Sequence, residues 1–306
     1  MNPAWSVILL TVLCGMGQGV FVMVLVGHVC GATPHFLILG TVASLVLCGL
    51  GLLASFFHLG RPERAWRTVA QWRTSWLSRE VIALPLFMFL VFVYGSLGLL
   101  AHGHGTALVG TLAFFACIAL WICTAMIYTC IRFIREWASP YTMANFILLS
   151  VASGTTIAMA LAAFSDWRMV KPMAVLSIVF TLAAAIVRGL SLKRNARLKP
   201  VSTLQSAIGF DNPQITQRSM GATGGTFNTR EFFHGRTLAF LRSIRWTFIA
   251  LTFVLPVLVV LLALVSEASG LMLLVLPLQA SGLVLERWFF FAQANHAQNL
   301  YYQVVS

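Results

Sequence analysis

Eight long apolar segments constrain the fold of this 306-residue chain more than any other feature of its sequence. A helix that crosses a lipid bilayer needs about 20 mostly apolar residues. Lipid offers no hydrogen bonds to a bare backbone, so segments of this kind cross the bilayer as helices. The sequence therefore predicts an all-α fold, a polytopic integral membrane bundle of eight transmembrane helices, near residues 5–29, 35–57, 80–101, 106–131, 141–164, 170–191, 244–265 and 270–291.

The composition excludes an ordinary soluble domain. Only 9% of the residues are charged and the mean hydropathy is +0.88, whereas a soluble domain carries about 25% charged residues. The net charge of +12 comes from basic residues between the apolar segments, which favours membrane lipid as a partner and argues against nucleic acid. We therefore treat residues 1–306 as a single transmembrane domain. No Lys or Arg precedes the first apolar segment, so we expect a retained span and not a cleaved secretory signal.

Prolines and glycines predict local features of the bundle. A proline is tolerated at the start of a helix, where its missing N–H has no partner, and Pro34, Pro140 and Pro172 are predicted helix starts. Inside a helix a proline removes a hydrogen bond, which predicts kinks at Pro85, Pro256 and Pro277. Glycines let helices approach closely, which we expect in the first two spans at Gly15, Gly17, Gly19, Gly49 and Gly51.

The basic residues predict the orientation of the protein. When the N-terminus and alternate connections are placed on one side, eighteen of the twenty Lys and Arg residues lie there, and only Arg168 and Lys171 lie on the other side. Connections rich in Lys and Arg remain in the cytoplasm. We therefore expect a multi-pass protein of the cell inner (cytoplasmic) membrane with both termini in the cytoplasm.

Two connections on the basic side differ from the rest. The loop 58–79 mixes arginines with tryptophans, and residues 193–243 form a long polar insertion. Loops as long as residues 193–243 are usually functional or disordered. We expect both cytoplasmic loops to dock a partner protein, with contacts from Arg67, Arg73, Arg230 and His234.

Metal and haem sites are not expected in this protein. None of the six cysteines forms a C-x-x-C pair, whereas an iron–sulfur cluster needs four grouped ligands. A b-type haem held by two histidines needs imidazoles from within the helices, but all seven histidines lie at predicted helix ends or in loops. We therefore expect neither a haem nor an iron–sulfur cluster, and we expect the cysteines to be packing residues.

The connection between the second and third spans carries the most informative residues. His58 ends one span and Glu80 begins the next, close to the basic membrane surface. A quinone needs a hydrogen-bonding group at each carbonyl and a path for protons; His changes charge near neutral pH, and a carboxylate can relay a proton. A structural interpretation competes with this one. An acid is favoured at any helix start, and the tryptophans and arginines are typical of a membrane interface.

This connection resembles that of the dimethyl sulfoxide reductase anchor family, whose members have H-L-G-x-P-x-R-A followed by L-S-x-E. The matching residues are His58, Leu59, Gly60, Pro62, Arg64, Ala65, Leu77, Ser78 and Glu80. The resemblance covers most of the predicted spans and is specific around residues 55–82, and more loosely around 128–140 and 283–302. It implies that His58 and Glu80 bind a quinone, either ubiquinone or menaquinone, in a site that we expect to contain His58, Arg61, Arg64, Trp76, Ser78 and Glu80.

Two departures point to one branch of that family. The respiratory sulfoxide reductase anchor turns its termini and its quinone loop toward the periplasm, and it lacks a long insertion between the sixth and seventh spans. The insertion and the C-terminal ERWFFFAQANHAQNLYY are similar to the anchor of a cytoplasmic-facing sulfite dehydrogenase. The resemblance implies two partners on the cytoplasmic face, an iron–sulfur electron-transfer subunit and a molybdopterin catalytic subunit. The anchor would not be catalytic alone, and it would pass electrons from sulfite oxidation to the quinone pool.

Other functions remain open at this stage. They are the anchor of a dimethyl sulfoxide reductase-like terminal reductase that oxidises quinol, a b-haem anchor, a transporter, and a tether without a quinone site. A transporter typically shows internal repeats and broken helices, and we find neither pattern in the sequence.

The remaining polar residues of the spans favour structural roles. We expect Glu286 and Arg287 to need partners on other helices and Arg188 to reach the interface. We expect Gln18, Asn145 and Gln279 to form interhelical hydrogen bonds.

Overall fold

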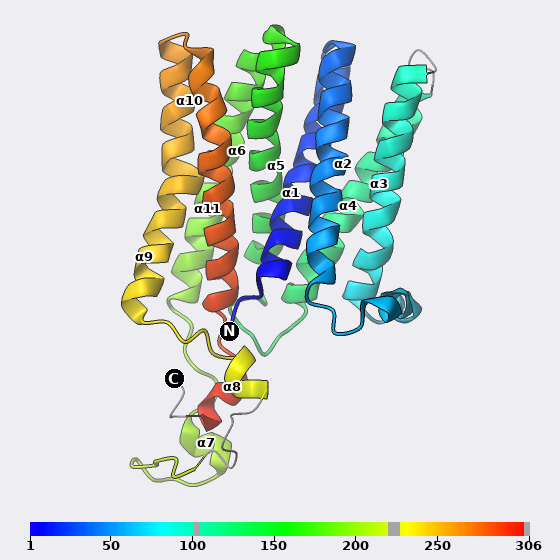
Figure 1. Cartoon of the computed structure of the whole chain (residues 1–306). Helices are drawn as coiled ribbons and strands as arrows, with labels where there is room; N and C mark the ends of the chain where they lie inside the picture. Colours follow the sequence, from blue (N-terminus) through cyan, green and yellow to red (C-terminus); the bar gives the residue numbers. More distant parts are fainter. Residues whose placement is uncertain (101–104, 220–226, 303–306) are drawn as a thin grey trace.

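Eight long helices stand side by side in the computed structural model of this protein, which describes residues 1–100, 105–219 and 227–302 (Figure 1). All eight are long and apolar enough to cross a membrane. The seventh span is built from three consecutive pieces, α9, η2 and α10. In sequence order the spans are α1 (Trp5–Val29), α2 (Pro34–Phe56), α3 (Trp76–Leu100), α4 (Thr106–Thr129), α5 (Pro140–Ser165), α6 (Trp167–Asn195), α9 (Leu238–Ile249) with η2 (Ala250–Val254) and α10 (Leu255–Val265), and α11 (Met272–Ala292).

The all-α bundle of eight spans predicted from the sequence is confirmed, and the protein is a multi-pass membrane protein. Pro34 and Pro140 are the first residues of α2 and α5, as expected. The predicted start at Pro172 is wrong, because α6 begins at Trp167 and runs through this proline. Asp166 precedes Trp167 and accepts the Arg168 N–H at 3.3 Å, so the helix is capped one turn earlier.

The seventh span contains a local change of helix type. Residues Ala250–Val254 form a π-helical turn two residues before Pro256, which agrees with the interruption predicted at this proline. The Thr252 carbonyl at this turn accepts the Gln279 side-chain amide of α11 at 3.4 Å. The α-helical pattern continues through Pro85 in α3 and through Pro277 in α11.

Small residues bring α1 close to α2 and α5 at the centre of the bundle. A Cβ atom added to Gly19 or Gly154 would clash with the backbone of the other helix, so α1 and α5 touch main chain to main chain there. A Cβ atom on Gly17 would lie 2.8 Å from the Ser44 carbonyl oxygen of α2. The close approach expected in the first two spans is therefore confirmed, except at Gly49, where the nearest atom is 4.0 Å away.

The longer connections lie at one end of the molecule, which we call the basic end. The 3₁₀-helix η1 (Pro62–Gln71), the short helices α7 (Leu204–Ile208) and α8 (Phe227–Glu231), and the 3₁₀-helix η4 (Ala297–Tyr301) lie there with residue 1 (Figure 1). The opposite end carries the α1–α2 and α5–α6 turns with Arg168 and Lys171. His102, His104 and residues 220–226 of the insertion lie outside the described residues.

The insertion between α6 and α9 packs against the segment that follows α11. The Phe232 ring stacks on the His296 imidazole with centroids 3.8 Å apart, and Asn299 donates a side-chain hydrogen bond to the Phe232 carbonyl at 3.2 Å. The Tyr301 hydroxyl donates to the Ala207 carbonyl at 3.1 Å. The insertion and the C-terminal segment therefore form one folded unit at the basic end.

Because α1 and α5 touch main chain to main chain, a methyl group added at this contact should destabilise the protein, whereas one added at an open position should not. Gly154→Ala places a Cβ against the α1 backbone and should lower the free energy of unfolding by about 1–3 kcal/mol. Gly189→Ala on α6 is the matched control, because its Cβ would meet no atom within 4 Å, and it should leave stability unchanged or raise it by about 0.5–1 kcal/mol. Thermal unfolding of both variants in detergent micelles measures the difference, and equal melting temperatures would contradict the packing described here.

Candidate functional site

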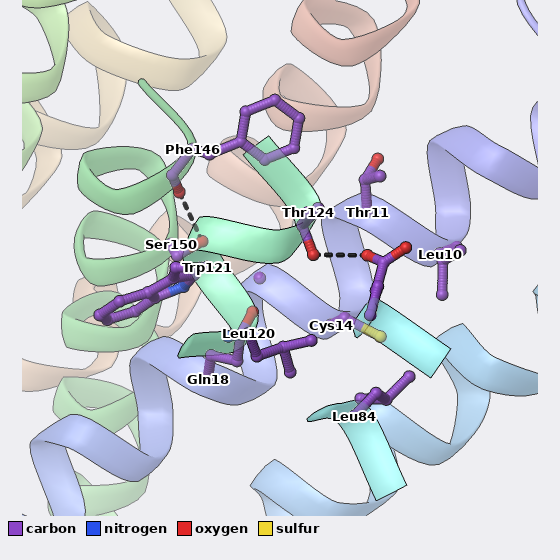
Figure 2. Close-up of a pocket in the computed structure, with 12 residues that line it drawn as sticks. Leu10, Thr11, Cys14, Gln18, Leu84, Leu120, Trp121, Thr124, Phe146 and Ser150 are labelled. Atoms are coloured by element: carbon purple, nitrogen blue, oxygen red, sulfur yellow. Dashed lines mark hydrogen bonds between the residues drawn. The ribbon is translucent and has the colours of Figure 1, made fainter. Parts of the chain in front are cut away.

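The Glu80 side chain lies inside the bundle near the start of α3. It is the fifth residue of this helix, and its carboxylate accepts a hydrogen bond from the Thr124 hydroxyl of α4. Figure 2 shows the Thr124 hydroxyl directed at this carboxyl group. An acid that only complemented the helix dipole would face solvent, whereas Glu80 is bonded to the neighbouring helix.

A small cavity lies beside the Glu80 carboxyl, and we call it the Glu80 cavity (Figure 2). Its volume is about 10 Å³, close to the minimum that holds one water molecule. Trp121 lines it, and the indole N–H of this residue has no partner among the described residues. A single water there would donate a hydrogen bond to the Glu80 carboxylate and would accept one from a donor in the wall, such as the Trp121 indole N–H. The polar side chains in its wall come from four helices: Thr11, Gln18, Glu80, Trp121, Thr124 and Ser150.

An aromatic cluster closes the Glu80 cavity toward the opposite end of the bundle. Phe21 follows Gln18 by one turn on α1, and Phe87 lies two turns beyond Glu80 on α3. Their ring centroids are 5.6 Å apart, and the Tyr94 ring lies 5.5 Å from Phe21. Phe21 and Phe87 are completely buried. These packed rings lie between the Glu80 cavity and the opposite end and replace space that water could fill.

His58 lies in the turn that follows α2, at the basic end, and its side chain is exposed. Partial burial lowers the pKa of its imidazole, because desolvation disfavours the charged form. The arginines of the same loop also point outward, and Arg64 lies 3.9 Å from the Glu63 carboxylate. His58, Arg61 and Arg64 are not among the residues that line the Glu80 cavity. The structure therefore brings Glu80 together with α1, α4 and α5, and leaves His58 at the surface.

Trp76 and Ser78 lie at the start of α3, where Arg79 connects them to the preceding loop. The Arg79 guanidinium is 4.2 Å from the centroid of the Trp76 ring and donates to the Trp72 and Arg73 carbonyls at 2.9 and 2.8 Å. Ser78 is buried, and its N–H donates to the Ser75 hydroxyl at 3.3 Å. These contacts fix the orientation of the loop relative to Glu80.

The residues expected to dock a partner occupy two separate places at the basic end. Arg67 and Arg73 are exposed near η1, and each guanidinium lies over the ring of the preceding tryptophan at 5.6 and 5.4 Å. Arg230 is exposed on α8, and the His234 Nδ1 accepts the Arg236 N–H at 3.0 Å. Burial lowers the pKa of His234, and nearby positive charges lower it further. Figure 1 shows η1 beneath α3 and α8 beneath α11.

A buried ion pair joins α6 to α11. The Arg188 Nε lies 2.8 Å from the Glu286 Oε1, and both side chains are at most 2% exposed. The expected extension of Arg188 to the interface is therefore wrong, because a carboxylate within the bundle stabilises the guanidinium where it stands. The Arg287 guanidinium lies 3.9 Å from the centroid of the Phe146 ring of α5, and the same ring lines the Glu80 cavity. Glu286 and Arg287 thus both have partners on other helices, as expected.

Interhelical hydrogen bonds of two of the three predicted residues are confirmed. The Gln18 side-chain amide donates to the Cys117 carbonyl of α4 at 3.2 Å, and that of Gln279 donates to the Thr181 hydroxyl of α6 at the same distance. Asn145 is buried, but its side-chain oxygen has no partner among the described residues. Those residues also contain no group of three His, Cys, Asp or Glu side chains placed to hold a metal ion.

Comparison with known proteins places the sequence in a family. Residues 1–302 match the family of the DMSO reductase anchor subunit (DmsC). The chain belongs to the DMSO reductase anchor subunit family. This confirms the resemblance carried by the His58–Glu80 connection, and the family match extends through α11 and η4.

Several known proteins are similar to this one over part or all of their length. The C subunit of the sulfite dehydrogenase of Allochromatium vinosum is 44% identical over 325 residues, which cover 100% of both proteins. YnfH of Escherichia coli, named as part of an anaerobic dimethyl sulfoxide reductase, is 28% identical over 61% of this sequence and 69% of its own length. The C component of the anaerobic dimethyl sulfoxide reductase of the same organism is 27% identical over 48% of this sequence and 54% of its own length.

Sequence reasoning missed the partners of Glu80. Thr124 is a hydroxyl residue five positions before the end of α4, and Glu80 lies at a similar distance from the start of α3. Because α3 and α4 are antiparallel neighbours, the two residues are at the same depth in the bilayer. Trp121, one turn earlier on α4, is a second polar group in an apolar segment. The matched depth of these residues was a usable signal, but nothing in the sequence shows which face of α4 meets α3.

The buried ion pair between Arg188 and Glu286 predicts that removal of one of its two charges strongly destabilises the protein. Glu286→Gln leaves a buried guanidinium without a counter-charge and should lower the free energy of unfolding by about 3–5 kcal/mol. Glu267→Gln, at an exposed position after α10, is the matched control and should have little effect. The double variant Arg188→Met with Glu286→Leu removes both charges and should recover most of the loss. Denaturation in mixed micelles measures all three, and a harmless Glu286→Gln would contradict the pairing.

Proposed function

We propose that this protein is the quinone-reactive membrane anchor of a molybdopterin and iron–sulfur oxidoreductase, which passes electrons from sulfite oxidation at the cytoplasmic face to the quinone pool. The observation that carries the proposal is the Glu80 carboxyl, held inside the bundle by Thr124 beside a cavity the size of one water, near the basic end. The full-length similarity to a protein named as part of a sulfite dehydrogenase supports the choice of branch.

The residues around Glu80 fit the needs of a quinone, but the Glu80 cavity does not hold the headgroup itself. A quinone supplies two carbonyl acceptors and takes up two electrons and two protons. The Glu80 cavity has room for one water only, so a headgroup would lie outside it, on the lipid side, between the end of α2 and the start of α3. His58 would donate a hydrogen bond to one carbonyl there, and Glu80 would serve the other. Ser78 and Trp76 border this position at the start of α3.

Each polar residue has a defined task in this proposal. Glu80 would take up a proton from the aqueous phase at the basic end, with a water in its cavity as relay, and pass it to a bound headgroup, and Thr124 orients the carboxyl for this transfer. His58 exchanges the second proton with the aqueous phase at the basic end, where it is exposed. Arg61 or Arg64 balances negative charge that develops before the protons arrive.

Docking of the partner subunits is proposed at the same end. The iron–sulfur subunit contacts the exposed arginines and tryptophans of η1 and the unit formed by the insertion and η4, and it carries the molybdopterin subunit. Trp66 is 71% exposed and Trp72 is 51% exposed, and exposed aromatic and arginine side chains are typical of interface cores. Electrons then enter the membrane beside His58 and Glu80.

Substitution of the two central residues tests the quinone site. His58→Ala should abolish electron transfer to a quinone, and Glu80→Gln should lower its rate by at least about 100-fold, because it removes a proton carrier. Both variants should leave the sulfite-dependent reduction of an artificial dye by the assembled complex intact. Glu63→Gln, an exposed acid of the same loop, is the matched control. Unchanged quinone reduction in the His58 or Glu80 variant would remove that residue from the site.

The aromatic cluster predicts that turnover is electroneutral. Phe21, Phe87 and Tyr94 separate Glu80 from the opposite end, so protons and electrons reach the quinone from the same side. In proteoliposomes that contain the complex, sulfite-driven quinone reduction should generate no membrane potential detectable with a voltage-sensitive dye. A potential that depends on turnover would overturn the one-sided arrangement.

A quinol-oxidising anchor is the second candidate. The two Escherichia coli relatives named after an anaerobic dimethyl sulfoxide reductase favour it, although they match only part of this sequence. The same residues would then release protons from quinol instead of delivering them. Assays of the purified complex with sulfite plus quinone, and with sulfoxide plus quinol, separate the two directions.

A further inference from the structure

A second, much larger cavity lies at the opposite end of the bundle, and we call it the outer pocket. Its volume is about 500 Å³, within the range of about 300–1,000 Å³ that is typical of sites for small organic ligands. It is bounded by the end of α1, the start of α2, the end of α3 and the start of α4. The proposed quinone chemistry at the basic end makes no use of it. The residues that matter for its chemistry are His28, Thr41, Tyr94, Gly95, Gly98 and Leu99.

The outer pocket reaches from the membrane surface into the hydrocarbon region. Thr41 lies seven residues after the start of α2 at Pro34, which corresponds to a depth of roughly 10 Å along the helix. Leu99 borders the pocket and is 58% exposed, and Phe92 on the same helix is 59% exposed. Exposed apolar side chains of a transmembrane helix face lipid tails, so lipid is the molecule with direct access to this pocket.

Two glycines of α3 leave a slot in the wall of the outer pocket. A Cβ atom added to Gly98 would meet no atom within 4 Å, so open space lies directly above its backbone. One turn earlier, a Cβ on Gly95 would lie 2.9 Å from the Thr41 methyl group of α2. α2 and α3 therefore touch at Gly95 and separate toward Gly98, which creates a space for a flexible apolar tail.

A hydrogen-bonded pair of side chains stands at the polar edge of the slot. The His28 Nδ1 and the Tyr94 hydroxyl oxygen are 2.8 Å apart. A neutral imidazole has one N–H and the phenol has one O–H, and their mutual hydrogen bond uses only one of these hydrogens. Whichever tautomer is present, one N–H or O–H of the pair remains to donate to a ligand. The pair therefore selects a ligand with an oxygen acceptor next to its apolar tail.

We propose that the outer pocket binds one phospholipid of the leaflet at the opposite end of the bundle. One acyl tail lies in the slot over Gly98, and a phosphate or ester oxygen accepts the free hydrogen of the His28–Tyr94 pair. A quinone shares the carbonyl acceptor but does not suit the position, because the proposed entry of electrons is at the basic end, on the other side of a hydrocarbon core that is about 30 Å thick. The bound lipid fills the gap between α2 and α3 and holds the ends of these helices together. The preference for a phospholipid over a quinone rests on the proposed entry of electrons at the basic end, whereas the pocket and its polar pair do not depend on that function.

Filling the slot tests the proposal. Gly98→Trp places an indole in the space assigned to the acyl tail, and Gly189→Trp is the matched control on the lipid-facing side of α6, where an added Cβ also meets nothing within 4 Å. The full-length protein is purified in nanodiscs, transferred to mild detergent and examined by native mass spectrometry. We expect one tightly held phospholipid in the unaltered protein and in Gly189→Trp, and its loss in Gly98→Trp.

Tyr94→Phe is a second variant that keeps the ring in contact with Phe21 and removes only the hydroxyl. We expect lipid occupancy in this variant to fall several-fold, with helix content by circular dichroism unchanged. The proposal is overturned if Gly98→Trp and Tyr94→Phe both retain the phospholipid, or if the molecule lost from Gly98→Trp is an isoprenoid quinone. Because no electron transfer is measured, the result does not depend on whether His58 and Glu80 react with quinone.

Discussion

Polar groups within the bilayer have to find partners inside the bundle, because lipid tails offer no hydrogen bonds. The pairs that satisfy this constraint also position the helices. Arg188 with Glu286 joins α6 to α11 at 2.8 Å, and Gln279 joins α11 to both Thr181 and the π-helical turn of the seventh span. Glu80 with Thr124 joins α3 to α4 in the same way. Glu80, the residue that we propose as a proton carrier, is therefore also part of this framework.

Close packing of small residues sets the size of the Glu80 cavity. α1 contributes Cys14, Gly15 and Gln18 to its wall, and α5 contributes Ser150, which lies opposite Gly15. A Cβ on Gly15 would lie 2.7 Å from the Ser150 hydroxyl oxygen, so the two helices leave very little room. Polar side chains around a site for one water suit proton transfer better than ligand binding. The outer pocket is larger because α2 and α3 diverge there.

The sequence predicts the spans well, since the length and polarity of a segment decide whether it crosses lipid. Glu80 was also within reach of sequence reasoning, because it follows the L-S-x-E pattern of the family and begins an apolar segment. The partner of Glu80 was not, because the face of α4 that meets α3 is decided by packing between helices. The expectation that Arg188 extends to the interface was wrong for the same reason. Its side chain is long enough to reach the interface, and only the position of Glu286 on α11 explains why it stays inside.

The contact of the insertion with the segment after α11 has a consequence for biogenesis. Phe232 and Ala207 are made well before His296 and Tyr301, which bind them. Part of the surface at the basic end is therefore finished only when the final span has been inserted. A ribosome-bound or truncated polypeptide would present η1 but not the completed unit beside it. Recruitment of soluble subunits that require both surfaces would then act as a checkpoint for complete translation.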